Sequence, residues 1–196
     1  EGLAGVQGDF RSNVGIRVAP HIVAAIQAAN SGTSPEAAAE LTPAVQDALV
    51  YLSDWDYRAA SGVGDDVSEA DIKSSVATSI LNAFLVYVVK NTLGDEGVAD
   101  INDAFKVRVI LRMLETPEVM KTFNADSGES WLWDDIATED KVETRNQMIV
   151  RSLVHALAFL SDPTAVGPSQ AGGFGTDDMS EWRWGMLHTV TLRSNV

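Results

Sequence analysis

The chain lacks cysteine, has few basic residues and contains no hydrophobic run long enough to cross a membrane. Without cysteine, disulfides, thiolate catalysis and cysteine-based zinc sites are excluded, while the redox compartment is left open. Lys and Arg number 14 against 28 Asp and Glu, a formal net charge of −14 that repels phosphate backbones, so we expect no nucleic-acid partner. The most apolar run, Ile80–Val89, is broken by Asn82 and is too short for a membrane span.

What the sequence does contain is typical of a globular domain. Its 196 residues, 45% hydrophobic and 21% charged, are sufficient for one domain with a sizeable core. The first residues, Glu1-Gly2-Leu3, include no initiator Met and match no signal-peptide pattern. Removal of a tag, a processed chain and a fragment all remain open as explanations.

Helical periodicity dominates up to residue 162. Apolar spacing and capping residues predict helices over 11–30, from 35 to about 55 with a restart at Thr42-Pro43, and over 69–92, 100–115, a short segment from 117, and 138–160. Pro20 is expected to bend or split the first. The helix over 69–92 carries two neighbouring apolar stripes, through Ile80 and through Leu81, so we expect it to be central and buried.

The chain changes character at Asp162. Residues 163–180 are rich in Gly and Pro and predict an irregular linker. Residues 183–193 alternate in polarity, with Trp184, His188 and Leu192 on one face, and predict a strand within a segment, 181–196, that belongs to a central sheet. Because a lone strand is unstable and its partners are not visible in residues 1–162, we expect them to lie outside the chain.

No set of side chains predicts a catalytic centre, and we assign no catalytic, cofactor-binding or metal-ligating residue. Neither a metal-binding spacing of histidines nor a Gly-x-Ser-x-Gly elbow occurs, and the acidic pairs fit no EF-hand loop. Each candidate has a structural reading that we favour over a functional one. These candidates are His21, His155, His188, Trp55, the pairs 65–66, 134–135 and 177–178, the glycine-rich run 172–175 as a flexible linker, and Glu181–Trp184 as the entry to a sheet.

Three stretches, in order, resemble the penicillin acylase family of N-terminal-nucleophile hydrolases. The first, Val6–Ser12 (VQGDFRS), is similar to a Gln-x-Asp segment of the family's β chain. The second, Leu49–Tyr57 (LVYLSDWDY) with the helical segment Ala77–Phe84, is similar to an L-x-x-W-D segment and the helix after it. The third, Trp182–Leu192 (WRWGMLHTVTL), resembles the family's W-x-W-G-x-L-H-x-V strand.

The resemblance implies a parent enzyme with an αββα sandwich, cut into an α and a β chain, whose N-terminal serine attacks an amide carbonyl. Glu1 has no hydroxyl nucleophile, and the family's asparagine, arginine and calcium-binding motifs would fall outside these residues. The resemblance therefore implies a fragment without catalytic residues and without a cofactor of its own. It also implies a periplasmic or extracellular location.

We thus expect a mainly α fold: a multi-helix, bundle-like region with a C-terminal strand or hairpin that joins the sandwich of a larger enzyme. Its partners would be the α chain, the rest of the β chain and an N-acyl substrate such as a β-lactam or an acyl-homoserine lactone. A homodimer through the uncovered strand is a further expectation. The alternative is a self-standing, all-helical protein-interaction domain without enzymatic activity.

Overall fold

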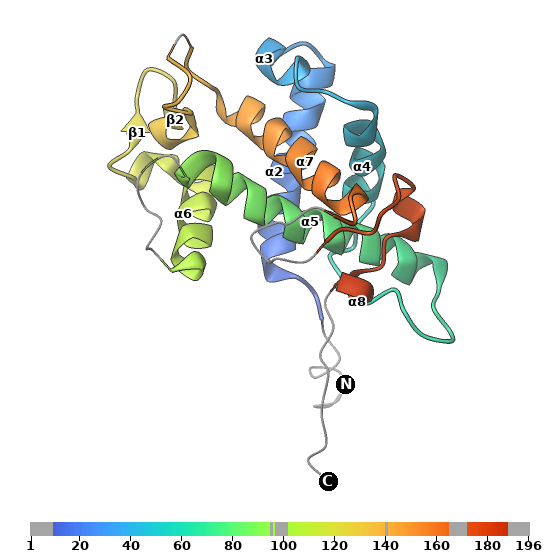
Figure 1. Cartoon of the computed structure of the whole chain (residues 1–196). Coiled ribbons are helices and arrows are strands. Elements are labelled where there is room, and N and C mark those ends of the chain that lie inside the picture. The colour runs from blue at the N-terminus through green and yellow to red at the C-terminus, as the bar shows by residue number, and fades with distance from the viewer. Residues whose placement is uncertain (1–9, 95, 97–101, 140, 165–171, 188–196) are drawn as a thin grey trace.

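The protein is mainly helical, as the sequence predicts, in a computed structural model that describes residues 10–94, 96, 102–139, 141–164 and 172–187 (Figure 1). Two short strands form its small antiparallel sheet. In chain order the elements are α2 (Asn13–Asn30), α3 (Pro35–Ala38), α4 (Pro43–Ser53), α5 (Glu69–Leu93), α6 (Asp103–Glu115), η1 (Pro117–Val119), β1 (Phe123–Asn124), β2 (Glu129–Ser130), η2 (Trp131–Trp133), α7 (Arg145–Ser161), η3 (Met179–Glu181) and α8 (Trp184–Leu187).

Helix α5 runs through the middle of the molecule and packs against α7 over its length, with α4, α6, α2 and η3 also in contact with it. The sequence predicts this position, because apolar side chains surround most of the helix. Phe84 and Val88 are fully buried. By length and composition alone α5 could cross a membrane, but 61% of its most apolar window is buried inside the protein, as in the core helix of a globular domain.

The first half of α5 buries hydroxyl groups as well as apolar side chains. Ser74, Ser75, Thr78 and Ser79 are each at most 6% exposed. The Thr78 hydroxyl donates to the Ser74 carbonyl at 2.7 Å, and the Ser79 hydroxyl to the Ser75 carbonyl at 3.0 Å. Because a buried polar group costs free energy unless it is bonded, these bonds within the helix let small side chains occupy a close-packed interface.

The helix starts follow the local capping signals. The Thr42 hydroxyl accepts from the Val45 N–H, with Pro43 at the first helical position. The Ser68 hydroxyl accepts from the Asp71 N–H at 3.1 Å, which caps the start of α5, and donates to the Asp71 carboxylate at 2.7 Å. Helix α2 continues through Pro20 as a single helix, so the expected split does not occur.

The start of α7 differs from the prediction. Thr138 does not begin the helix; Thr144 caps it by accepting from the Gln147 N–H, and Val142, expected on the buried face, is 75% exposed. The Thr138 hydroxyl is instead bonded to the buried carboxylate of Glu143 at 2.9 Å. This bond to a residue five positions away takes up the Thr138 hydroxyl, which then does not cap the helix.

The expected strand is wrong over residues 184–187, which form the short helix α8. The Trp184 N–H donates to the Ser75 hydroxyl at 2.7 Å, and the Gly185 N–H to the Ser61 carbonyl at 2.7 Å. A strand needs a neighbouring strand, and the β1–β2 hairpin lies on the other side of the molecule (Figure 1). Residues 188–193 of the expected strand, with His188, lie outside the described residues.

Candidate binding site

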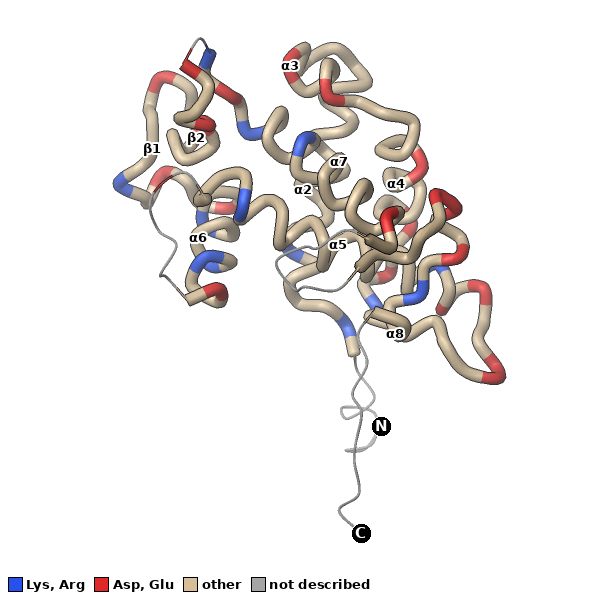
Figure 2. The backbone as a smooth tube through the Cα atoms, viewed as in Figure 1, with Lys and Arg blue, Asp and Glu red and all other residues tan. Residues whose placement is uncertain are grey.

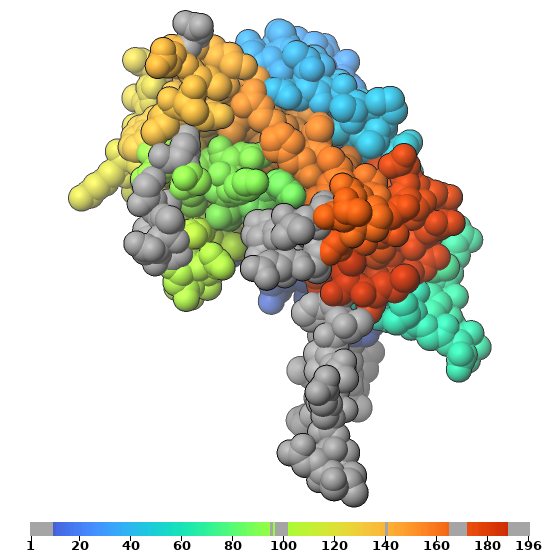
Figure 3. Space-filling model, viewed as in Figure 1, coloured from blue at the N-terminus to red at the C-terminus, as the bar shows by residue number. Residues whose placement is uncertain are grey.

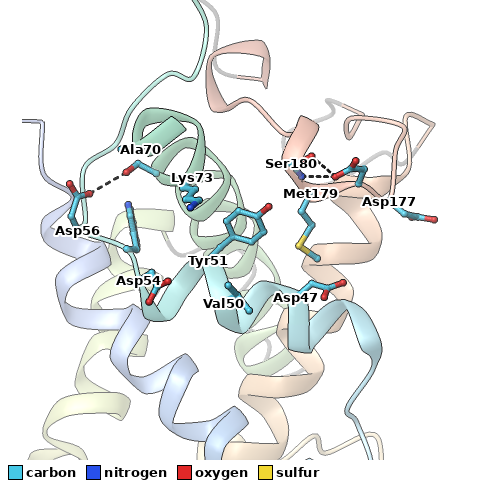
Figure 4. A pocket seen from close by; sticks show the side chains of 13 residues that line it. Asp47, Val50, Tyr51, Asp54, Asp56, Ala70, Lys73, Asp177, Met179 and Ser180 are labelled. Carbon is cyan, nitrogen blue, oxygen red and sulfur yellow. Dashed lines mark hydrogen bonds between the residues drawn. The ribbon is translucent and has the colours of Figure 1, made fainter. Parts of the chain in front are cut away.

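An open cavity of about 680 Å³ lies between α4, the first turns of α5 and the segment that contains η3. Figure 4 shows Tyr51 of α4 near its centre, between Lys73 of α5 and Met179 of η3. Val50, also on α4, lines the cavity and is 62% exposed. Pockets of this volume are large enough for a drug-sized ligand.

Trp55 lines the cavity and is 6% exposed. Its indole N–H donates to the Arg58 carbonyl at 2.9 Å, which confirms the prediction that Trp55 packs the end of a helix and finds an acceptor. A Cβ on Gly15 would lie 2.6 Å from the Trp55 ring, so this glycine permits the close approach of α2. Tyr57, against the same indole at 5.5 Å, has a φ of +66°. A non-glycine residue in this region marks a conformation that the surroundings impose.

The polar groups of the cavity are predominantly acidic. Asp56 accepts from the Ser74 hydroxyl at 3.2 Å and from the Arg58 N–H at 2.9 Å. Lys73, the cation of the wall, is paired with Glu69 at 2.9 Å. Figure 2 shows acidic positions gathered around α4 and the η3 segment, whereas basic positions lie along α6.

Two titratable groups of the wall show the effect of this environment. Burial raises the pKa of the Tyr51 hydroxyl, and the negative charge of Asp178 raises it further. Hydrogen bonds from Ser180, whose hydroxyl lies 2.6 Å from the carboxylate, lower the pKa of Asp178. The phenol therefore stays neutral and the carboxylate stays charged near neutral pH.

The three family-like stretches meet beside this cavity at the start of α5. The Ser12 N–H donates to the Tyr57 carbonyl at 2.8 Å, which joins the described end of the first stretch to the second. Ser75 joins α8 to the loop after Tyr57: its hydroxyl accepts from the Trp184 N–H and donates to the Ser61 carbonyl at 2.9 Å. Figure 3 shows residues 172–187 packed beside the 55–68 region.

Burial, and then a neighbouring arginine, lowers the pKa of each of the two described histidines. Burial lowers the pKa of His21, and the positive charge of Arg145 adds to the effect. Burial, and then Arg151, lowers the pKa of His155, whose Nδ1 lies 3.1 Å from the amide nitrogen of Asn91. His155 is exposed, as the prediction of a surface role requires. Within the described residues, no group of three His, Asp or Glu side chains could hold a metal ion.

The acidic pairs serve different purposes. Asp66 lines a second pocket of about 460 Å³, beside Arg58 and Phe10. The pair at 134–135 holds the buried Glu143: the Asp134 carboxylate accepts from its N–H at 3.0 Å, and the N–H of residue 135 donates to its carboxylate at 3.1 Å. The pair at 177–178 lines the larger cavity.

The glycine-rich run packs against the end of α7. A Cβ on Gly173 would lie 2.1 Å from the Phe159 carbonyl oxygen, so this glycine serves a close backbone approach. Phe174 stacks on Trp182 at 5.7 Å, and the Trp182 indole donates to the Thr176 carbonyl at 2.9 Å. The Trp182 ring is buried in the helical layer, as predicted, although residues 179–187 enter no sheet.

Sequence analysis did not identify the cavity, because its walls come from residues 47–56, 70–74 and 177–180. Each segment taken alone has an ordinary structural role as a helix face or a cap. The local signals available were the acidic pair at 177–178 and Trp55 between two aspartates. Neither indicates that the segments meet.

Comparison with known proteins gives one match. The family model described as penicillin amidase matches residues 1–196, the whole chain. A search of curated proteins and a search of solved structures gave no significant match.

Proposed function

Because the chain belongs to the penicillin amidase family, we propose that it forms the helical part of an amidohydrolase that cleaves the amide bond of N-acylated small molecules. The match over residues 1–196 carries this proposal. Family membership supports an acylase-like hydrolase. The acyl group, and the choice between β-lactams, acyl-homoserine lactones and related compounds, belong to the proposal.

The proposal also holds that the catalytic groups lie elsewhere in the parent enzyme. Amide hydrolysis by an activated serine or threonine needs a base within hydrogen-bonding reach of the hydroxyl. Among the described residues, no serine or threonine hydroxyl is bonded to His21 or His155. The Ser152 hydroxyl shares a neighbour with His155, because the Asn91 amide nitrogen lies 3.1 Å from both. Ser152 is fully buried.

The remainder of the enzyme is the proposed partner. Phe10, Val63 and Met186 are 47%, 46% and 62% exposed and lie where the described ends of the chain meet the 58–63 loop. Arg58 extends over the Phe10 ring at 5.0 Å and pairs with Asp71 at 3.2 Å. This mixed apolar and charged surface supports contact with another part of the same enzyme.

The test is an amidase assay on the 196-residue chain and on the longer protein that contains it. Both are purified, shown to be helical by circular dichroism, and incubated with a panel of N-acyl-4-nitroanilides while nitroaniline release is followed. We expect hydrolysis by the longer protein and none by the 196 residues. Turnover by the short chain would refute its non-catalytic role. An inactive longer protein would refute the amidase function and favour an interaction domain.

A further inference from the structure

The cavity between α4, α5 and η3 combines an apolar wall with negative charge that the protein neutralises only in part. Its apolar wall is formed by Val50, Tyr51 and Trp55, in and just after α4, and by Met179 of η3, a segment distant in sequence. Figure 4 labels Val50, Tyr51 and Met179. Val50 is 62% exposed, so part of this wall is open to a ligand from solvent. Burial of such a surface favours a ligand with a hydrophobic body.

The charge of the cavity determines the sign of the ligand. Five aspartates and one lysine line it. Lys73 is paired with Glu69 at 2.9 Å, outside the lining, and its charge also acts on Asp54. The charge of Arg183 acts on Tyr51 and Asp178, so the positive charges at the cavity are fewer than its five aspartates. An anion would therefore meet an unfavourable field, whereas a cation would gain from it.

The aspartates divide into two groups by their hydrogen bonds. Asp56 is bonded to Ser74 and Asp178 to Ser180, so these two carboxylates hold the protein's own wall together. The structure records no hydrogen bond or ion pair for the side chains of Asp47, Asp54 and Asp177, which are all described residues. Their carboxylates can pair with a ligand without breaking a hydrogen bond, although the charge of Asp54 also acts on Lys73.

We propose that this cavity binds a hydrophobic organic cation, an ammonium group attached to an aromatic or long aliphatic body. The body lies against Val50 and Met179, and the ammonium faces the aspartates and the ring of Tyr51, whose π face also favours a cation. A bare metal ion suits the site less well. No described group of three acidic or histidine side chains could coordinate one, and the apolar wall would gain nothing from it.

The test compares three ligands of one shape and different charge by isothermal titration calorimetry on the 196-residue chain. They are 1-naphthylmethylammonium, 1-naphthylmethanol and 1-naphthoate. We expect saturable binding of the ammonium, weaker binding of the alcohol and none of the carboxylate. Raising the salt concentration should weaken only the ammonium, because the pairing lies in an open cavity.

Variants then locate the site. Asp47→Asn and Asp54→Asn keep the side-chain shape, and each should weaken ammonium binding about fivefold, the effect of removing one charge a few ångströms away in a solvated site. Asp126→Asn, an exposed acid in the β1–β2 hairpin, is the matched control and should leave the affinity unchanged. Val50→Ser should weaken the ammonium and the alcohol alike.

Three outcomes would overturn the proposal. They are no saturable ammonium binding at millimolar concentration, equal affinity for the alcohol, and an equal loss in the Asp126 variant. Because the assay measures binding and not hydrolysis, these outcomes leave the amidase proposal standing. In the same way, a negative amidase assay would not contradict the proposed binding of an organic cation.

Discussion

Glu143→Gln tests how much a buried carboxylate just before α7 contributes to stability. The Glu143 side chain is fully buried. Its carboxylate accepts from the Thr138 hydroxyl at 2.9 Å and from the backbone N–H of Asp135 at 3.1 Å, and Arg151 lies 3.4 Å away. Glutamine keeps the shape and one acceptor, but it loses the charge and directs an N–H₂ group at groups that donate.

The expected loss is about 2 kcal/mol of unfolding free energy. Breaking a buried ion pair costs roughly 3–5 kcal/mol when the remaining charge is left alone. Here Arg151 keeps a partner, since its Nη2 lies 2.9 Å from Glu40, and the glutamine oxygen still accepts one hydrogen bond. Both features reduce the loss to about the worth of one charged hydrogen bond, roughly 1.5–3 kcal/mol.

The stability difference between the wild type and Glu143→Gln should depend on pH. Burial alone would raise the pKa of Glu143, but hydrogen bonds from the Asp135 N–H, Thr138 and Lys141 outweigh it and lower the pKa below the ordinary 4.5. A lowered folded pKa stabilises the protein above the unfolded value, and this contribution is lost as the pH falls through the folded one. The gap between wild type and variant should therefore shrink below about pH 4.3.

Urea unfolding followed by tryptophan fluorescence measures this gap at neutral pH and in steps below the ordinary pKa of a glutamate, about 4.3. Glu118→Gln, at an exposed position, is the control and should match the wild type. A variant as stable as the wild type at neutral pH would refute the role of the carboxylate. A gap of constant size down to the lowest pH would show that the loss comes from packing and not from charge.

Two further substitutions test the contacts at the start of α5. Gly62→Ala and Gly128→Ala both place a Cβ at positive φ, +69° and +72°, but only the first brings it within 2.4 Å of a neighbour, the Ser75 hydroxyl. In thermal unfolding, Gly128→Ala should cost about 1 kcal/mol and Gly62→Ala about 2 kcal/mol more, and equal losses would contradict the contact. Ser75→Ala removes the hydroxyl that joins α8 and the 61–63 loop to α5. It should lower the unfolding free energy by about 1–3 kcal/mol and speed amide hydrogen exchange in α8. Ser79→Ala is the control, because Ser79 is equally buried but bonded only within α5, and it should change neither the unfolding free energy nor the exchange in α8.

The helices were predictable where their signals are local. Thr42-Pro43 and Ser68 start α4 and α5 as expected, and Gly94 follows the last residue of α5. These residues act on the backbone within four positions of themselves, so the sequence contains the whole interaction. The central position of α5 was also predictable, because its apolar side chains cover more than one face.

Prediction failed where two local signals compete or where a contact spans the chain. Thr138 and Thr144 are both adequate caps, and the choice depends on Glu143, which draws the Thr138 hydroxyl away from a helix start. The alternating polarity of residues 183–193 can be read from the sequence, but whether they form a strand depends on a neighbouring strand, which the sequence does not show. At Trp184 a serine hydroxyl on α5 occupies the place of a strand neighbour.

The three family-like stretches can identify the family although no catalytic residue has been assigned to them. In the described residues these stretches do architectural work. Trp55 fills the space beside Gly15, Trp182 stacks on Phe174, and Trp184 is bonded through its backbone to α5. Large aromatic side chains that pack three distant segments together produce a recognisable pattern through packing alone. On the proposed function, a search for amidase chemistry begins in the remainder of the proposed parent enzyme, and a search for small-molecule binding in this chain begins at the acidic cavity beside Trp55.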